Sequence, residues 1–69
     1  MQYKLLDSKS NVLEEVNLPP LDGKVGEQVK KSDGTVMYLL SLGEMTFGRG
    51  GVMQDIVVGT KAEADAMAK

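Results

Sequence analysis

Residues 35–42, TVMYLLSL, form the longest nearly unbroken apolar run of the chain, and Gly34 and Gly43 bound it. An apolar run of this length between turn residues is typical of a strand that is buried on both faces. Successive side chains of a strand point to opposite faces, so the run divides into two sets. We predict that it is the central strand of a sheet, with Val36, Tyr38, Leu40 and Leu42 on one face and Met37 and Leu39 on the other.

The length of the chain, 69 residues, limits it to one domain over residues 1–69. A domain of this size buries only about 60% of the surface that its unfolded chain exposes. The chain has no Cys and no His, which excludes disulfides, thiolate chemistry and the usual zinc sites. With two Tyr, one Phe and no Trp it also has few large side chains for a core. We therefore expect a homodimer or another protein partner to supply part of the stability.

The charge of the chain is slightly acidic, with eight basic and ten acidic residues and a net charge of -2. This balance disfavours a general affinity for nucleic acid, which requires an excess of positive charge. The first residues lack the basic and apolar regions of a signal peptide, and no apolar run approaches the roughly 18 residues of a membrane-spanning helix. We expect a soluble, cytoplasmic protein that does not bind a membrane.

The first hairpin is predicted from two apolar segments, residues 2–6 and 12–18, on either side of the polar residues 7–11. Residues 12–18 also fit a short helix capped by Asn11 with Glu14 three residues later. We favour a strand that pairs with the first. Pro19 and Pro20 end either structure, because proline cannot donate to a ladder or continue a helix.

The glycines are confined to residues 23–59, which indicates several short strands joined by tight turns. We predict a loop that leads into a strand with Val25 and Val29 facing inward. Asp33 and Gly34 then form the strongest hairpin signal of the sequence.

The last third is predicted to contain two more strands and a helix. Residues 44–47 alternate, with Met45 and Phe47 expected to face inward, and residues 48–51, GRGG, form a turn into the strand 52–58. Thr60 and Glu63 have the spacing of a capping box, which predicts a helix over residues 61–69. A helix this short must dock to persist, and we expect it to dock through Ala62, Ala66 and Met67.

The resulting fold class is α+β, mainly β. It is a small antiparallel meander or barrel-like sheet of four to six strands with a short C-terminal helix. An all-β domain with a frayed tail is the alternative.

Enzymatic chemistry finds little support in the sequence. Glu14 and Glu15 are adjacent, so on a strand they point to opposite faces, and the other acids are scattered among turns. The acids also lack the dense alternating spacing of a calcium loop. The GRGG turn leads into a strand and not into a helix, unlike phosphate-binding loops. We predict a non-enzyme with no cofactor and no metal site.

Binding of another protein, or of a second copy, is the function that we favour. Arg49 is the only arginine, and it lies in a glycine turn beside Phe47, where its planar guanidinium could grip a carboxylate or phosphate. Apolar Met-bearing faces and open strand edges are common contact surfaces. The candidate partner-binding residues are Arg49, Phe47, Met45, Lys30 and Lys31.

A small-barrel nucleic-acid-binding protein is the alternative function. It would use the basic residues of two hairpin tips, if those tips lie together, and an aromatic side chain that stacks on a base. The residues concerned are Lys24, Lys30, Lys31 and Arg49, with Tyr38 or Phe47. Lysines on an edge strand also serve simply to prevent aggregation.

Overall fold

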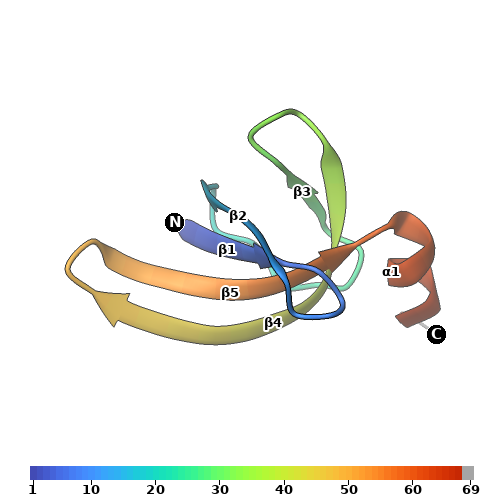
Figure 1. Cartoon of the computed structure of the whole chain (residues 1–69). Coiled ribbons are helices and arrows are strands. Elements are labelled where there is room, and N and C mark those ends of the chain that lie inside the picture. The colour runs from blue at the N-terminus through green and yellow to red at the C-terminus, as the bar shows by residue number, and fades with distance from the viewer. Residues whose placement is uncertain (68–69) are drawn as a thin grey trace.

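The computed structural model of the chain describes residues 1–67 as a mainly β fold with one short helix. Its strands form one five-stranded sheet in the order β2-β1-β5-β4-β3, which curls into a half-barrel with the helix at one end (Figure 1). The predicted fold class, α+β and mainly β, is confirmed. The elements are β1 (Gln2–Leu6), β2 (Val12–Asn17), β3 (Gln28–Lys30), β4 (Val36–Gly48), β5 (Gly51–Gly59) and α1 (Lys61–Met67).

Three hairpins and one parallel pair make up the sheet. The hairpins β1–β2, β3–β4 and β4–β5 are antiparallel, as predicted. The first strand, β1, also pairs with the last, β5, and this pair is parallel, so the sheet is mixed and is not a simple meander. The central strand is therefore β5. Our prediction that residues 35–42 form the central strand is wrong. Because β1 pairs with β5 on the side away from β4, β5 is the central strand and β4 is next to it.

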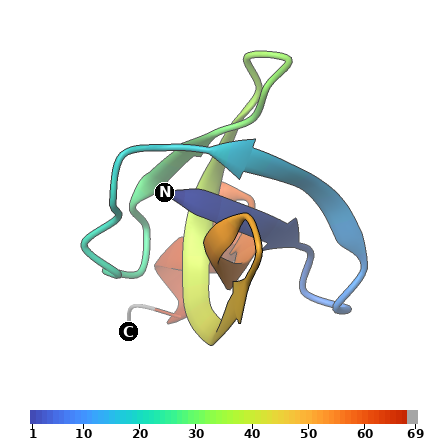
Figure 2. The ribbon, with the colours of Figure 1, turned by 90° about the vertical axis from the view of Figure 1, so that its left-hand side faces the viewer.

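The curl brings the two outermost strands of the sheet towards one another (Figure 2). The carboxylate of Glu14 in β2 accepts hydrogen bonds from the backbone N–H of Ser32, at 3.0 Å, and from its hydroxyl, at 2.6 Å. Ser32 lies two residues after the end of β3, so this contact connects the two outermost strands of the sheet.

Polar side chains set the predicted turns. Asp7 Oδ1 accepts hydrogen bonds from the backbone N–H groups of Lys9 and Asn11, both at 2.9 Å. Asp33 Oδ1 accepts from the N–H of Thr35 at 2.9 Å, and the next residue, Gly34, has a φ of 93° that suits glycine. The hydrogen bond from Asn11 lowers the pKa of Asp7, and the hydrogen bond from Thr35 lowers the pKa of Asp33.

The core contains one large anchor that we did not expect. Tyr3 is fully buried, and its hydroxyl accepts a hydrogen bond from the backbone N–H of Leu21 at 2.8 Å. The aromatic ring therefore fills the core, while its hydroxyl provides a hydrogen-bond partner for a backbone N–H of the loop that follows β2. The buried cluster consists of Tyr3, Leu5, Val16, Val29, Leu39, Ile56 and Val58.

A bulge in β4 changes the faces that we predicted for residues 35–42. Leu39 pairs with Val58 and Ser41 with Val57, so Leu40 is an extra residue in the ladder. Leu39 faces the core, whereas Leu40 is buried outside that cluster, beside Gly59 and the start of α1. The predicted burial of this strand on both faces is therefore confirmed only at Leu39 and Leu40.

The helix begins with the predicted capping box. The N–H of Thr60 donates to Glu63 Oε1 at 3.1 Å, and the N–H of Glu63 donates to Thr60 Oγ1 at 3.2 Å. The docking prediction is wrong, because Ala64 is buried while Ala62, Ala66 and Met67 are exposed. Ala64 is therefore the buried position of the helix, which packs against β4. The predicted helical residues 68 and 69 lie outside the described part of the chain.

Candidate functional site

The outer parts of β4 and β5 extend beyond the rest of the sheet as a two-stranded arm, residues 43–52 (Figure 1). β3 pairs with β4 only over Val36–Tyr38, and β1 pairs with β5 only from Met53 onward. Within residues 1–67, residues 43–48 therefore pair only with β5, and residues 51 and 52 pair only with β4. The arm gives the molecule its long dimension of 38 Å, against 24 and 22 Å in the other directions.

A second bulge decides which side chains the arm exposes. Leu42 pairs with Ile56 and Met45 with Gln54, so Gly43 and Glu44 both lie opposite Asp55. Because of this extra residue, Met45 lies on the same face as Leu42. Gly43 suits the bulge, since a Cβ there would lie 3.1 Å from both the Cβ and the backbone oxygen of Asp55.

The exposed face of the arm continues the face that forms the core. Leu42 pairs with the core residue Ile56, and Phe47 shares its face through the same ladder. We call Leu42, Met45 and Phe47 the apolar strip; their side chains are 45%, 48% and 76% exposed. Our prediction that Met45 and Phe47 face inward is therefore wrong. They lie on the face of the sheet that forms the core, but in the part of β4 that extends beyond the buried cluster, so their side chains are exposed.

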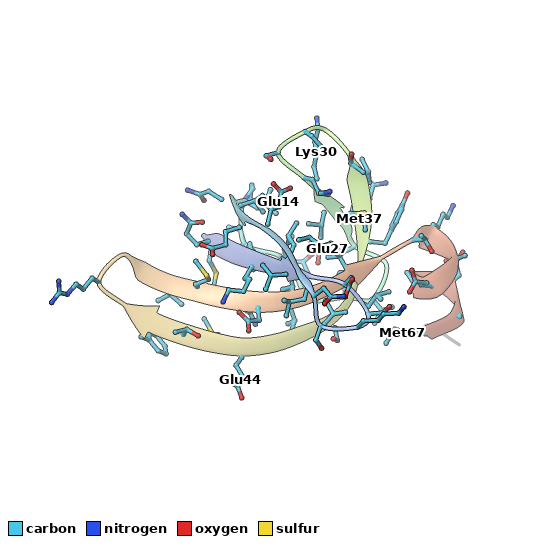
Figure 3. The ribbon with its side chains drawn as sticks, in the orientation of Figure 1. Glu14, Glu27, Lys30, Met37, Glu44 and Met67 are labelled. Carbon is cyan, nitrogen blue, oxygen red and sulfur yellow. The ribbon has the colours of Figure 1, made fainter. Side chains whose placement is uncertain are left out.

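The outer edge of β4 is open along the arm. On the side of β4 that faces away from β5, the backbone hydrogen bonds of the described residues end at Leu39. The N–H of Leu39 donates to the backbone oxygen of Glu27 at 2.8 Å. Among the described residues, 43–48 pair with no strand except β5. Figure 3 shows Glu44 projecting from β4 on the side away from β5. An open edge carries backbone N–H and C=O groups that another strand can pair with.

The predicted site residues fall into two separate groups. Met45, Phe47 and Arg49 lie together on the arm, with Arg49 in its turn. Lys30 is at the end of β3 and Lys31 follows it, near the turn that Figure 1 shows at another end of the molecule. Figure 3 likewise places Lys30 far from the arm. The two hairpin tips are apart, so the lysines and Arg49 form no common basic patch.

Lys30 and Lys31 instead border a hollow between β2 and β3, the two outermost strands of the sheet. Its volume is about 400 Å³, and the Glu14–Ser32 contact lies beside it. Both signs of charge occur in the lining, so the hollow does not favour one charge of ligand. It is lined by Glu15, Val16, Asn17, Leu18, Lys30, Lys31 and Ser32.

Two titratable groups of the described chain, Asp7 and Asp33, have lowered pKa values. The pKa shifts at Asp7 and Asp33 come from hydrogen bonds within their own turns. Residues 1–67 contain no group of three carboxylates placed to hold a metal ion. Over the same residues, no helix has the length and hydropathy that crossing a membrane requires.

Comparison with known proteins finds no matching family model, curated protein or solved structure. The sequence indicates Met45, Phe47 and Arg49 as candidate contact residues, and the structure adds Leu42 to them. The signal that could have indicated an exposed hairpin is the glycine content of residues 43–51, which leaves that segment few side chains to bury.

Proposed function

We propose that this chain is a non-enzymatic protein-protein interaction module that binds through the arm. The observation that carries the proposal is the apolar strip, which includes a Phe47 side chain that is 76% exposed. Burying an exposed side chain of this kind contributes about 1.5–3 kcal/mol, which favours association. The ladder to β5 already holds the strip extended, so little conformational entropy is lost on binding.

Other exposed apolar residues do not form a comparable surface. Val12 and Leu13 lie at the start of β2, where its register with β1 shifts, and neither is aromatic. Val25, which we expected to face inward, is exposed in the loop before β3, and Val36 and Met67 lie on β4 and α1. Scattered apolar residues are normal on protein surfaces, whereas several on one face indicate a contact site.

The open edge of β4 supports the same proposal. Edge strands of soluble proteins are commonly protected by lysine, proline or a covering segment. Residues 43–48 contain neither lysine nor proline, and Glu44 is their only charged residue. A partner could therefore add a strand to β4 and cover the apolar strip in the same contact.

Paired serine variants test the proposal. Met45→Ser with Phe47→Ser removes most of the apolar strip, and Val12→Ser with Leu13→Ser is a matched control elsewhere on the sheet. Sedimentation velocity of each pure protein, and affinity capture from an extract of the source cells, measure self-association and binding of other proteins. We expect the arm variant to lose association at least about tenfold, a change of roughly 1.4 kcal/mol, and the control to keep it.

Two outcomes would contradict the proposal. Association that is unchanged in the arm variant would show that another surface binds. Capture of nucleic acid that falls steeply between about 50 and 200 mM salt would instead indicate charge-driven binding. Circular dichroism of both variants checks that they remain folded.

A further inference from the structure

We infer that the arm binds a second copy of this chain, with the two β4 strands antiparallel along their open edges and a two-fold axis at Thr46. The inference rests on the proposed function and names its partner. It would join two curled sheets into one continuous sheet across the axis.

The regular part of the open edge contains Thr46. The bulge at Gly43 and Glu44 bounds it on one side, and the turn at Arg49 bounds it on the other. Residues 45–48 therefore form the regular open edge. A two-fold axis at Thr46 pairs residues 45–47 of the two copies with one another.

This register also matches the apolar side chains. Residues directly opposite in an antiparallel pair project to the same face. With Thr46 on the axis, Met45 lies opposite Phe47 of the second copy, and symmetry repeats the pair. An axis at Met45 would place Phe47 opposite Gly43, and an axis at Phe47 would place Met45 opposite Arg49. Only the central register pairs all four apolar side chains with one another.

The charges of the arm are complementary in the same register. Glu44 and Arg49 are the only charged residues within 43–52, and their signs are opposite. Glu44 lies opposite Gly48 of the second copy, which has no side chain and is next to Arg49 of that copy. The carboxylate can therefore reach the guanidinium, and the two-fold axis generates two such pairs. Glu44 already projects from the side of β4 that faces away from β5 (Figure 3).

A single introduced thiol tests the axis directly, because the chain has no cysteine of its own. Thr46→Cys would place two thiols opposite one another on the axis, at the Cβ separation of about 4.5–5.5 Å of directly paired residues. Oxidised glutathione converts two such thiols into one disulfide and is itself reduced. We expect Thr46→Cys to form a covalent dimer at least about tenfold faster than the control Ser41→Cys, which is exposed on the same strand but outside the paired segment.

Charge exchange tests the register independently. Glu44→Arg and Arg49→Glu should each weaken the dimer about tenfold in sedimentation equilibrium, because each places like charges opposite one another. The double variant should recover the dimer. An equimolar mixture of the two single variants should also associate, since each copy then meets its complement.

Several results would overturn the inference. They are equal cross-linking of Thr46→Cys and Ser41→Cys, failure of the mixed charge variants to associate, and assemblies that grow beyond a dimer. A wild-type protein that stays monomeric at millimolar concentration would also overturn it. Loss of captured proteins in the Met45→Ser, Phe47→Ser variant decides the proposed function separately, so the two can fail independently.

Discussion

At the scale of single residues, Tyr3 connects the core to the loop after β2. The ring is buried within the cluster, and the hydroxyl accepts the N–H of Leu21, which is partly buried. Removing the hydroxyl would leave that N–H without its partner. A buried donor without a partner costs more than the net gain of an average hydrogen bond.

We expect Tyr3→Phe to lower the free energy of unfolding by about 1–3 kcal/mol. Tyr3→Ala should lower it by about 3–5 kcal/mol, since a cavity is added. Urea denaturation followed by circular dichroism measures both. Tyr38→Phe is the control, because Tyr38 is only half-buried and its hydroxyl has no hydrogen bond within residues 1–67. Equal stability of Tyr3→Phe and wild type would contradict the structural role of the hydroxyl.

Gly59 allows the helix to approach β4. A Cβ at this position would lie 2.9 Å from Leu40 Cδ1 and 2.9 Å from Glu63 Oε1. We expect Gly59→Ala to cost about 1–3 kcal/mol of stability through overpacking. At the control position, Gly50, a Cβ would meet nothing within 4 Å, so Gly50→Ala should be nearly neutral. Thermal unfolding compares the two, and equal effects would mean that the helix is not tightly packed at Gly59.

At the scale of elements, local signals predicted the hairpins and the helix start. Asp33 with Gly34, and the polar residues 7–11, mark turns whose hydrogen bonds lie within the turn itself. Thr60 and Glu63 mark the capping box for the same reason. Features that depend on nearby residues could therefore be predicted from the sequence.

Features that depend on distant residues could not be predicted. No local pattern indicates that β1 pairs with β5, whose residues lie far along the chain. The bulges at Leu40 and at Gly43–Glu44 break the alternation that a face prediction assumes. For the candidate site, Met45, Phe47 and Arg49 were selected because they are neighbours in sequence. The alternation of residues 44–47 predicts that Met45 and Phe47 face inward, but their exposure depends on where β1 and β3 stop pairing; the only local sign of it is the glycine content of residues 43–51.

The turns around Asp7 and Asp33 predict how stability varies with pH. Hydrogen bonds lower the pKa of each carboxyl in the folded state, so folding favours the ionised form. The stabilisation is complete above the unfolded pKa, about 3.9, and is lost as the pH falls through the folded pKa. Thermal unfolding between about pH 2 and 7 should therefore show falling stability below about pH 4. Asp7→Asn with Asp33→Asn should flatten that slope, and a slope that remains the same would locate the acid sensitivity elsewhere.

At the scale of the whole molecule, self-pairing through the arm would make stability depend on concentration. A dimer that forms only from folded copies stabilises the folded state by mass action. We expect the melting temperature to rise with protein concentration, by roughly 4–8 °C for each 1 kcal/mol that association adds. Phe47→Asp should abolish the rise without changing the melting temperature of the dilute protein, because Phe47 lies outside the core. Calorimetry over a hundredfold range of concentration measures both proteins, and a flat wild-type response would favour a monomer.

The parallel pairing of β1 with β5 sets the order in which a newly made chain can fold. Tyr3 leaves the ribosome long before Gln54, its neighbour in the sheet. At about 5–20 residues per second, the delay between them is roughly 3–10 s. During that delay the first hairpin keeps one of its sides unpaired. The half-barrel can therefore close only after β5 has been translated. Chaperones that bind nascent chains can act on the unpaired first hairpin before that point.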